Sequence, residues 1–144
     1  MNKKIRTDKL LYADITYKVR GAIFAVYNEL GFGHKEQVYQ KALAEEFDSV
    51  DISYKREKSL DVKYKNSVVG NYKPDFVIED KIVMEIKAVE FMPKSYEIQL
   101  INYLKTTEFH LGLLVNFGSP RLYIKRLIFS HPRKSVVDQR KSLV

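Results

Sequence analysis

Hydrophobic residues recur at helical spacing through the first fifty positions. Six of them predict one face of a helix that ends at Gly31: Leu11, Ile15, Val19, Ile23, Val26 and Leu30. Glycine at positions 31 and 33 supplies a helix stop. A second helix is predicted over about Lys35 to Phe47, and its inward face is expected to consist of Val38, Ala42, Leu43 and Phe47.

From residue 52 the hydrophobic period changes to two, which is typical of strands. Alternation predicts strands over 52–56 and 60–64, then a turn at Asn66-Ser67 and a return strand over 68–72. The runs 75–78 and 82–87, divided by Glu79-Asp80-Lys81, predict a hairpin. Both runs carry apolar residues on their two faces, so we expect central strands with helices covering the sheet.

The last third of the chain predicts a helix followed by two strands. Pro93 is suited to open a third helix that runs to about Lys105, and strands are predicted over 111–115 and 122–129. The expected order is α-α-β-β-β-β-α-β-β. It indicates an α/β or α+β fold, one domain over residues 1–130 around a mixed sheet. Residues 131–144 are polar and basic, and we expect a loosely ordered tail there.

Composition narrows the class of protein. A chain of 144 residues with 45% hydrophobic and 30% charged residues is typical of one globular domain. No run approaches the ~20 apolar residues of a membrane span, and no apolar run follows the basic N-terminus, so neither a membrane anchor nor a secretory signal is expected. The absence of cysteine excludes thiolate metal sites and fits a cytoplasmic location.

Positive charge is concentrated near the C-terminus. The formal net charge is +7, and from Arg121 onward seven basic residues accompany a single acid. The first 120 residues are therefore almost neutral. This asymmetry fits a polyanionic partner, although taken alone it favours the plainer interpretation of a solvated basic tail.

The predicted hairpin gathers charged side chains on one face. With a loop centred on Asp80, Ile78 faces Ile82 and Asp75 faces Glu85, and Lys87 projects from the same face. Two carboxylates this close repel each other and need a shared proton, a protein cation or a divalent metal. Oxygen donors suit Mg²⁺ or Mn²⁺. The alternative is an ordinary salt bridge between Lys87 and both acids.

Three motifs together resemble a known family. Pro74-Asp75 and Glu85-Ile86-Lys87 are similar to the Pro-Asp…(Asp/Glu)-x-Lys signature of the restriction-endonuclease-like nuclease superfamily. Gly33, Glu36 and Tyr39 resemble the Gly-x-x-Glu-x-x-Tyr motif of the GxxExxY protein family, with His34-Lys35 where apolar residues are usual. Gln99 and Tyr103 are similar to the Gln-x-x-x-Tyr of exonuclease-type members. The resemblance extends from about Leu10 to Phe129.

The resemblance implies a restriction-endonuclease-like fold and a metal-dependent nuclease that acts on DNA or RNA. Asp75 and Glu85 would bind Mg²⁺ or Mn²⁺, together with Glu36 and the carbonyl of Ile86. Lys87 would assist the attacking water or the transition state. Gln99 and Tyr103 would position the substrate, and by analogy the chain is a candidate homodimer.

Nucleic-acid contacts are expected from a further set of residues: Tyr39, Arg121, Lys125, Arg126, Arg133 and Lys134. Each of several site residues has a plainer interpretation. Glu36 is also suited to stabilise a helix dipole, and Tyr39 to be a core tyrosine with a satisfied hydroxyl. Two other functions stay open: a non-catalytic nucleic-acid-binding or protein-interaction module, and a structural acid cluster without ligand.

Overall fold

Two helices open the fold, α2 (Ala13–Leu30) and α3 (Glu36–Ser49), in a computed structural model that describes residues 11–132. The predicted stripe on α2 is confirmed, because Val19, Ile23 and Val26 lie in the core. The prediction for Val38 is wrong, since its side chain is 39% exposed. The inward face of α3 follows Tyr39, Leu43 and Phe47 at four-residue spacing, which rotates Val38 toward solvent.

A five-stranded mixed sheet forms the centre of the fold, in the order β1-β4-β5-β6-β7. Its strands are β1 (Tyr54–Arg56), β4 (Phe76–Ile78), β5 (Ile82–Lys87), β6 (Leu111–Asn116) and β7 (Tyr123–Ile128). Only the β5–β6 pair is parallel. The predicted mixed sheet flanked by helices is confirmed and agrees with a restriction-endonuclease-like fold.

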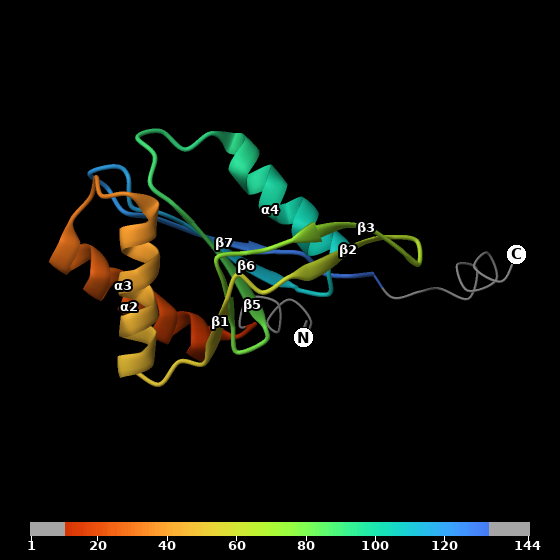
Figure 1. The fold of residues 1–144 in the computed structure, drawn as a ribbon, viewed down its shortest axis with the longest axis horizontal. Coiled ribbons are helices and arrows are strands. Elements are labelled where there is room, and N and C mark those ends of the chain that lie inside the picture. Colours follow the sequence, from red (N-terminus) through yellow and green to blue (C-terminus); the bar gives the residue numbers. More distant parts are fainter. Residues whose placement is uncertain (1–10, 133–144) are drawn as a thin grey trace, which may run out of the picture.

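The β4–β5 hairpin has the predicted register, with Ile78 opposite Ile82. Its alternate residues enter two separate cores. Phe76 and Met84 pack with α2 and α3, whereas Val77 and Val83 pack with helix α4 (Lys94–Thr106). The sheet is therefore covered by helices on both faces (Figure 1), as two-sided apolar strands require.

Strands β2 (Leu60–Tyr64) and β3 (Ser67–Tyr72) do not join this sheet but form a separate two-stranded ribbon. The ribbon contains a register shift between Val62 and Lys63. Leu60 and Val62 pack with the same core cluster as α4. Five strands thus lie between α3 and α4. They correspond to the five predicted strand ranges, although the expected order counted four, and β1 and β2 belong to different sheets.

The structure describes only two residues of the predicted C-terminal tail. The predicted tail, with Arg133 and Lys134, lies outside the described residues except for His131 and Pro132. The His131 ring nitrogen Nε2 is 3.0 Å from the carbonyl of Phe109. Within residues 11–132, no helix has both the length and the apolar character needed to cross a membrane.

The loop between β5 and α4 is held by a buried amide. The Asn116 side chain is 1% exposed, accepts a hydrogen bond from the Val89 N–H at 3.0 Å and donates one to the Val89 carbonyl at 2.9 Å. Gly118 lies against the same backbone, and a Cβ added there would meet the Val89 nitrogen at 2.1 Å. Space rather than backbone conformation therefore requires glycine at 118.

A pair of glycine substitutions tests this packing. Gly118→Ala should lower the free energy of unfolding by about 3 kcal/mol or more, because backbone must move to admit the methyl group. Gly21→Ala is the matched control: Gly21 lies exposed inside α2 with nothing within 4 Å, so alanine should stabilise the chain by ~0.5–1 kcal/mol. Urea unfolding of both variants measures the difference, and equal effects would contradict the packing argument.

Candidate active site

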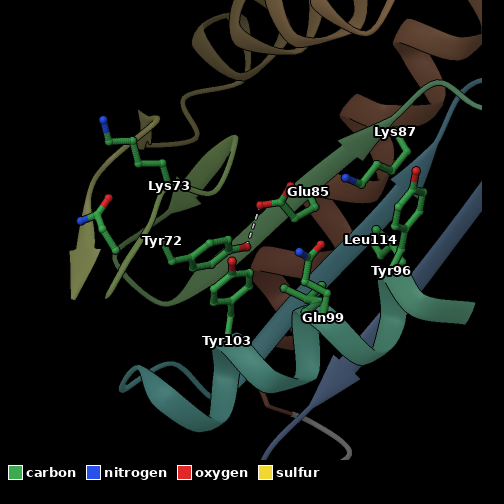
Figure 2. A pocket seen from close by; sticks show the side chains of 10 residues that line it. Tyr72, Lys73, Glu85, Lys87, Tyr96, Gln99, Tyr103 and Leu114 are labelled. Atoms are coloured by element: carbon green, nitrogen blue, oxygen red, sulfur yellow. Dashed lines mark hydrogen bonds between the residues drawn. The ribbon is translucent and has the colours of Figure 1, made fainter. Parts of the chain in front are cut away.

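A cavity of about 230 Å³ lies between the end of the ribbon, β5 and α4 (Figure 2). Ten residues line it: Asn71, Tyr72, Lys73, Glu85, Lys87, Tyr96, Gln99, Leu100, Tyr103 and Leu114. Four of the predicted catalytic residues, Glu85, Lys87, Gln99 and Tyr103, therefore meet at one cavity. Glu85 and Lys87 come from β5, and Gln99 and Tyr103 come from α4, which packs on one face of the sheet.

Glu85 is held by a tyrosine that the sequence interpretation did not include. The Tyr72 hydroxyl donates a hydrogen bond to Glu85 Oε1 at 2.7 Å. The Tyr72 ring stacks on the Tyr103 ring, with centroids 3.8 Å apart and planes 6° from parallel (Figure 2). Tyr103 thus acts on Glu85 through Tyr72, and burial together with the Glu85 charge raises the pKa of the Tyr72 hydroxyl, which keeps it a donor.

Asp75 is anchored by two neutral donors. Its Oδ2 accepts a hydrogen bond from the Ile86 N–H at 2.6 Å, and its Oδ1 accepts one from Gln40 Nε2 at 3.0 Å. The same Gln40 amide group lies 3.2 Å from Glu36 Oε1. Gln40, buried on α3, therefore links the carboxylate of Glu36 to that of Asp75.

The carbonyl of Ile86 faces the Asp75 side of the strand. In a β-strand the N–H and C=O of one residue point to the same edge, and the Ile86 N–H points to Asp75. The backbone groups of the next residue, Lys87, point to the opposite edge of β5, where its carbonyl accepts a hydrogen bond from the Phe117 N–H at 2.9 Å. The Ile86 carbonyl therefore points to the edge of β5 on which Asp75 lies.

Burial and neighbouring charges raise the pKa values of three acids at the site. Burial raises the pKa of Glu85 to about 7, and the Asp75 charge adds to the shift. Burial also raises the pKa values of Asp75 and Glu36, with the Asp75 charge contributing to the second. The Lys87 charge lowers the pKa of each acid without cancelling the shift.

Lys87 does not neutralise the acids by direct contact. Among residues 11–132, no ion pair within 4.0 Å includes Lys87. This argues against the alternative of an ordinary salt bridge from Lys87 to Asp75 and Glu85. Its ammonium lies 4.4 Å from the centre of the Tyr96 ring instead. An aromatic face attracts a cation, so Tyr96 holds the ammonium at the cavity wall.

The acids do not form a ready-made metal site. In the described part of the chain, no three histidine, aspartate or glutamate side chains lie where they could hold one metal ion. Glu36 and Asp75 share the Gln40 amide, and Glu85 accepts a hydrogen bond from Tyr72. The donor set nevertheless fits a hard divalent cation, because the predicted ligands are all oxygen atoms, and burial raises the pKa values of Asp75 and Glu85.

Burial overturns the predicted nucleic-acid role of Tyr39. Its side chain is 0% exposed and stacks on Phe117 with centroids 4.3 Å apart. Its hydroxyl donates to the Gly31 carbonyl at 2.7 Å and accepts from the His34 N–H at 3.1 Å. The plainer interpretation, a core tyrosine with a satisfied hydroxyl, describes it correctly.

The described basic residues that were predicted to contact nucleic acid, Arg121, Lys125 and Arg126, do not form one continuous surface. Lys125 and Arg126 are neighbours on β7 and therefore point to opposite faces of the sheet. Lys125 pairs with Glu97 on α4 at 3.2 Å, whereas the Arg126 guanidinium donates to the Leu11 carbonyl. Arg121 is exposed in the turn before β7.

Three residues at the site escaped the sequence interpretation: Gln40, Tyr72 and Tyr96. Gln40 was the easiest to find, because it lies four residues after Glu36 on the same helix face. Tyr72 was hidden by its place in the ribbon, whose path the alternation pattern does not specify. Tyr96 meets Lys87 only once α4 packs on the sheet.

The raised pKa of Glu85 predicts a pH-dependent stability without divalent ions. Below about pH 4.5 Glu85 is protonated in both folded and unfolded chains, whereas near pH 7 only the unfolded chain ionises it freely. Between these values the free energy of unfolding should fall as pH rises, by up to about 3 kcal/mol from this group. In EDTA, the free energy of unfolding of Glu85→Gln should therefore increase relative to that of the wild type between pH 5 and pH 8. Urea unfolding at both values tests this, and a pH-independent difference would contradict it.

Comparison with known proteins agrees with this geometry. Residues 13–127 match the family model described as the PD-(D/E)XK nuclease superfamily. No curated protein matches the chain, and no solved structure does. The matched range contains α2, all of the sheet except Ile128, and the acids Glu36, Asp75 and Glu85. Pro74-Asp75 with Glu85-Ile86-Lys87 fits the pattern that the family description names. The chain belongs to the PD-(D/E)XK nuclease superfamily.

Proposed function

We propose that this chain is a metal-dependent nuclease that hydrolyses phosphodiester bonds of DNA or RNA. One observation carries the proposal: Glu85 and Lys87 line one cavity beside Asp75, at the signature positions of a nuclease superfamily. Raised pKa values of this kind, caused by burial and neighbouring charge, gather at functional sites.

Four oxygen donors support binding of Mg²⁺ or Mn²⁺: the carboxylates of Asp75, Glu85 and Glu36, and the carbonyl of Ile86. A divalent cation supplies positive charge to the phosphate and acidifies a water molecule. Gln40 keeps Glu36 within reach of Asp75, and Tyr72 orients Glu85. Second partners of this kind fix the direction of ligand side chains.

The remaining cavity residues serve the substrate. In hydrolysis a water oxygen bonds to phosphorus, the bond from phosphorus to the leaving sugar oxygen breaks, and that oxygen gains a proton. Lys87, held over Tyr96, donates to the phosphoryl oxygens as their negative charge grows. Gln99 lines the same cavity and positions the phosphate backbone by hydrogen bonding.

We also assign the chain to the GxxExxY family within this superfamily. The motif residues support a structural role in placing Glu36. Gly33 has φ +97°, a conformation that favours glycine, and Tyr39 ties the α2–α3 turn to the Gly31 carbonyl. The turn is therefore closed where α3 begins, and Glu36 is the first residue of that helix.

Activity measurements test the nuclease proposal. Purified chain with Mg²⁺ or Mn²⁺ should cleave DNA or RNA, and Glu85→Gln should abolish cleavage because it removes a ligand charge. Lys87→Met should slow cleavage by about 100-fold or more, because one donor to the transition state is lost. Glu45→Gln, an exposed acid on α3, is the matched control and should retain full rate.

Substrates for this assay should include single-stranded, duplex and branched DNA and RNA. Absence of cleavage on all of them would refute the nuclease. If Mn²⁺ still raised the melting temperature of the wild type but not of Glu85→Gln, the chain would be a non-catalytic module that retains the metal site.

Tyr72→Phe tests the positioning of Glu85. The ring and its stack on Tyr103 remain, but the hydrogen bond to Glu85 is lost, so metal affinity or cleavage rate should fall about 10–100-fold. Tyr17→Phe is the control, because Tyr17 is 81% exposed on α2. Calorimetric titration with Mn²⁺ and the cleavage rate report the two effects, and unchanged values in both would contradict this role for Tyr72.

A further inference from the structure

The β2–β3 ribbon runs from the candidate site into solvent. Its last residue, Tyr72, and the adjoining Lys73 line the cavity. From there the ribbon passes along α4, and its turn projects beyond the C-terminal end of that helix (Figure 1). The ribbon therefore connects the site directly to a surface that the sheet does not use.

The outer half of the ribbon exposes large apolar side chains. Tyr64, Val68 and Val69 are 64%, 58% and 61% exposed, whereas Leu60 and Val62 pack toward α4. Neither strand of the ribbon pairs with the main sheet. Apolar side chains gathered on a projecting ribbon mark an interaction surface.

Lysines lie beside these apolar residues. Residues 60–73 contain three lysines, Lys63, Lys65 and Lys73, against one acid, Asp61. Lys63 and Lys65 also line a groove between the ribbon and the end of α4, where Lys105 joins them and the acids Asp61 and Glu108 leave an excess of one positive charge. The positive charge therefore follows the ribbon from the cavity to its turn and complements a polyanion.

The dimensions of the ribbon suit one form of nucleic acid. A six-residue strand such as β3 spans about 20 Å, which corresponds to about 6 base pairs of B-form duplex. The major groove of B-DNA admits a two-stranded ribbon, and apolar side chains contact thymine methyl groups there. The major groove of A-form RNA is too narrow for such an element.

We infer that the β2–β3 ribbon docks in the major groove of double-helical DNA and brings a neighbouring phosphate to the cavity. Lys63 and Lys65 contact phosphates beside the groove, and Val68 and Val69 contact base edges. This surface rests on the proposed nuclease function for the class of its ligand. It is tested by binding alone, so the two can fail separately.

Salt dependence tests the lysine contacts. Binding of a fluorescent duplex DNA is measured by anisotropy in EDTA over a series of salt concentrations, so that no metal-dependent cleavage occurs. Lys63→Ala with Lys65→Ala should weaken binding roughly tenfold or more at low salt, and should reduce the slope of log K against log salt by about two. The control, Lys18→Ala with Arg20→Ala, removes the same charge from exposed positions on α2 and should leave the slope unchanged. Equal slopes for the two variants would overturn the inference.

A second variant separates apolar contact from charge. Val68→Ser with Val69→Ser should weaken binding by the same factor at every salt concentration, because no phosphate contact is lost. Both side chains are exposed, so the melting temperature should stay unchanged. Unaltered affinity of this variant would overturn the base-edge contact.

Other ligands give distinct results. The wild type should bind duplex DNA more tightly than duplex RNA of the same sequence, and equal or tighter binding of RNA would overturn groove docking. Loss of a dimer by the ribbon variants in size-exclusion chromatography, with DNA affinity unchanged, would assign the ribbon to self-association and also overturn it. Ribbon-dependent binding without cleavage in Mn²⁺ would refute the nuclease and leave this surface standing.

Discussion

The repulsion between Asp75 and Glu85 is the constraint around which the site is organised. The β4–β5 register places the two acids beside each other on one face, and burial raises the pKa of both. Each is then stabilised by neutral donors, a backbone N–H and an amide for Asp75 and a hydroxyl for Glu85. Neutral donors orient a carboxylate without cancelling its charge, so the pair remains suited to a cation.

The unequal lengths of two paired strands create the room for this site. β4 has three residues and β5 has six, so residues 85–87 extend past their partner strand. The Ile86 N–H points to the edge of β5 that β4 no longer covers, and it bonds to Asp75 there. Helices from both faces reach this open end, α3 with Gln40 and α4 with Tyr103. A single strand end thus joins residues from two separate cores.

Rigidity around the cavity comes from the packing and hydrogen bonding of neutral side chains. The Tyr72–Tyr103 stack joins the ribbon to α4, and the buried amide of Asn116 holds the loop that leads from β5 into α4. Gly118 permits the close approach of that loop. Because the ribbon and α4 are joined at the cavity, a ligand that docks on the ribbon is held at a defined position relative to Glu85.

The sequence by itself determined the local features of this protein. The helical stripe of α2 and the register of the β4–β5 hairpin follow from periods of 3.6 and two, which depend only on near neighbours, and the signature acids were identified by their resemblance to a family motif. Only the tertiary structure decided which distant residues meet. Gln40 bonds to Asp75 35 positions away, the ribbon leaves the sheet, and Tyr39 is buried rather than exposed. Such contacts depend on how whole elements pack, because hydrophobic burial selects a face of each element but does not specify its partner.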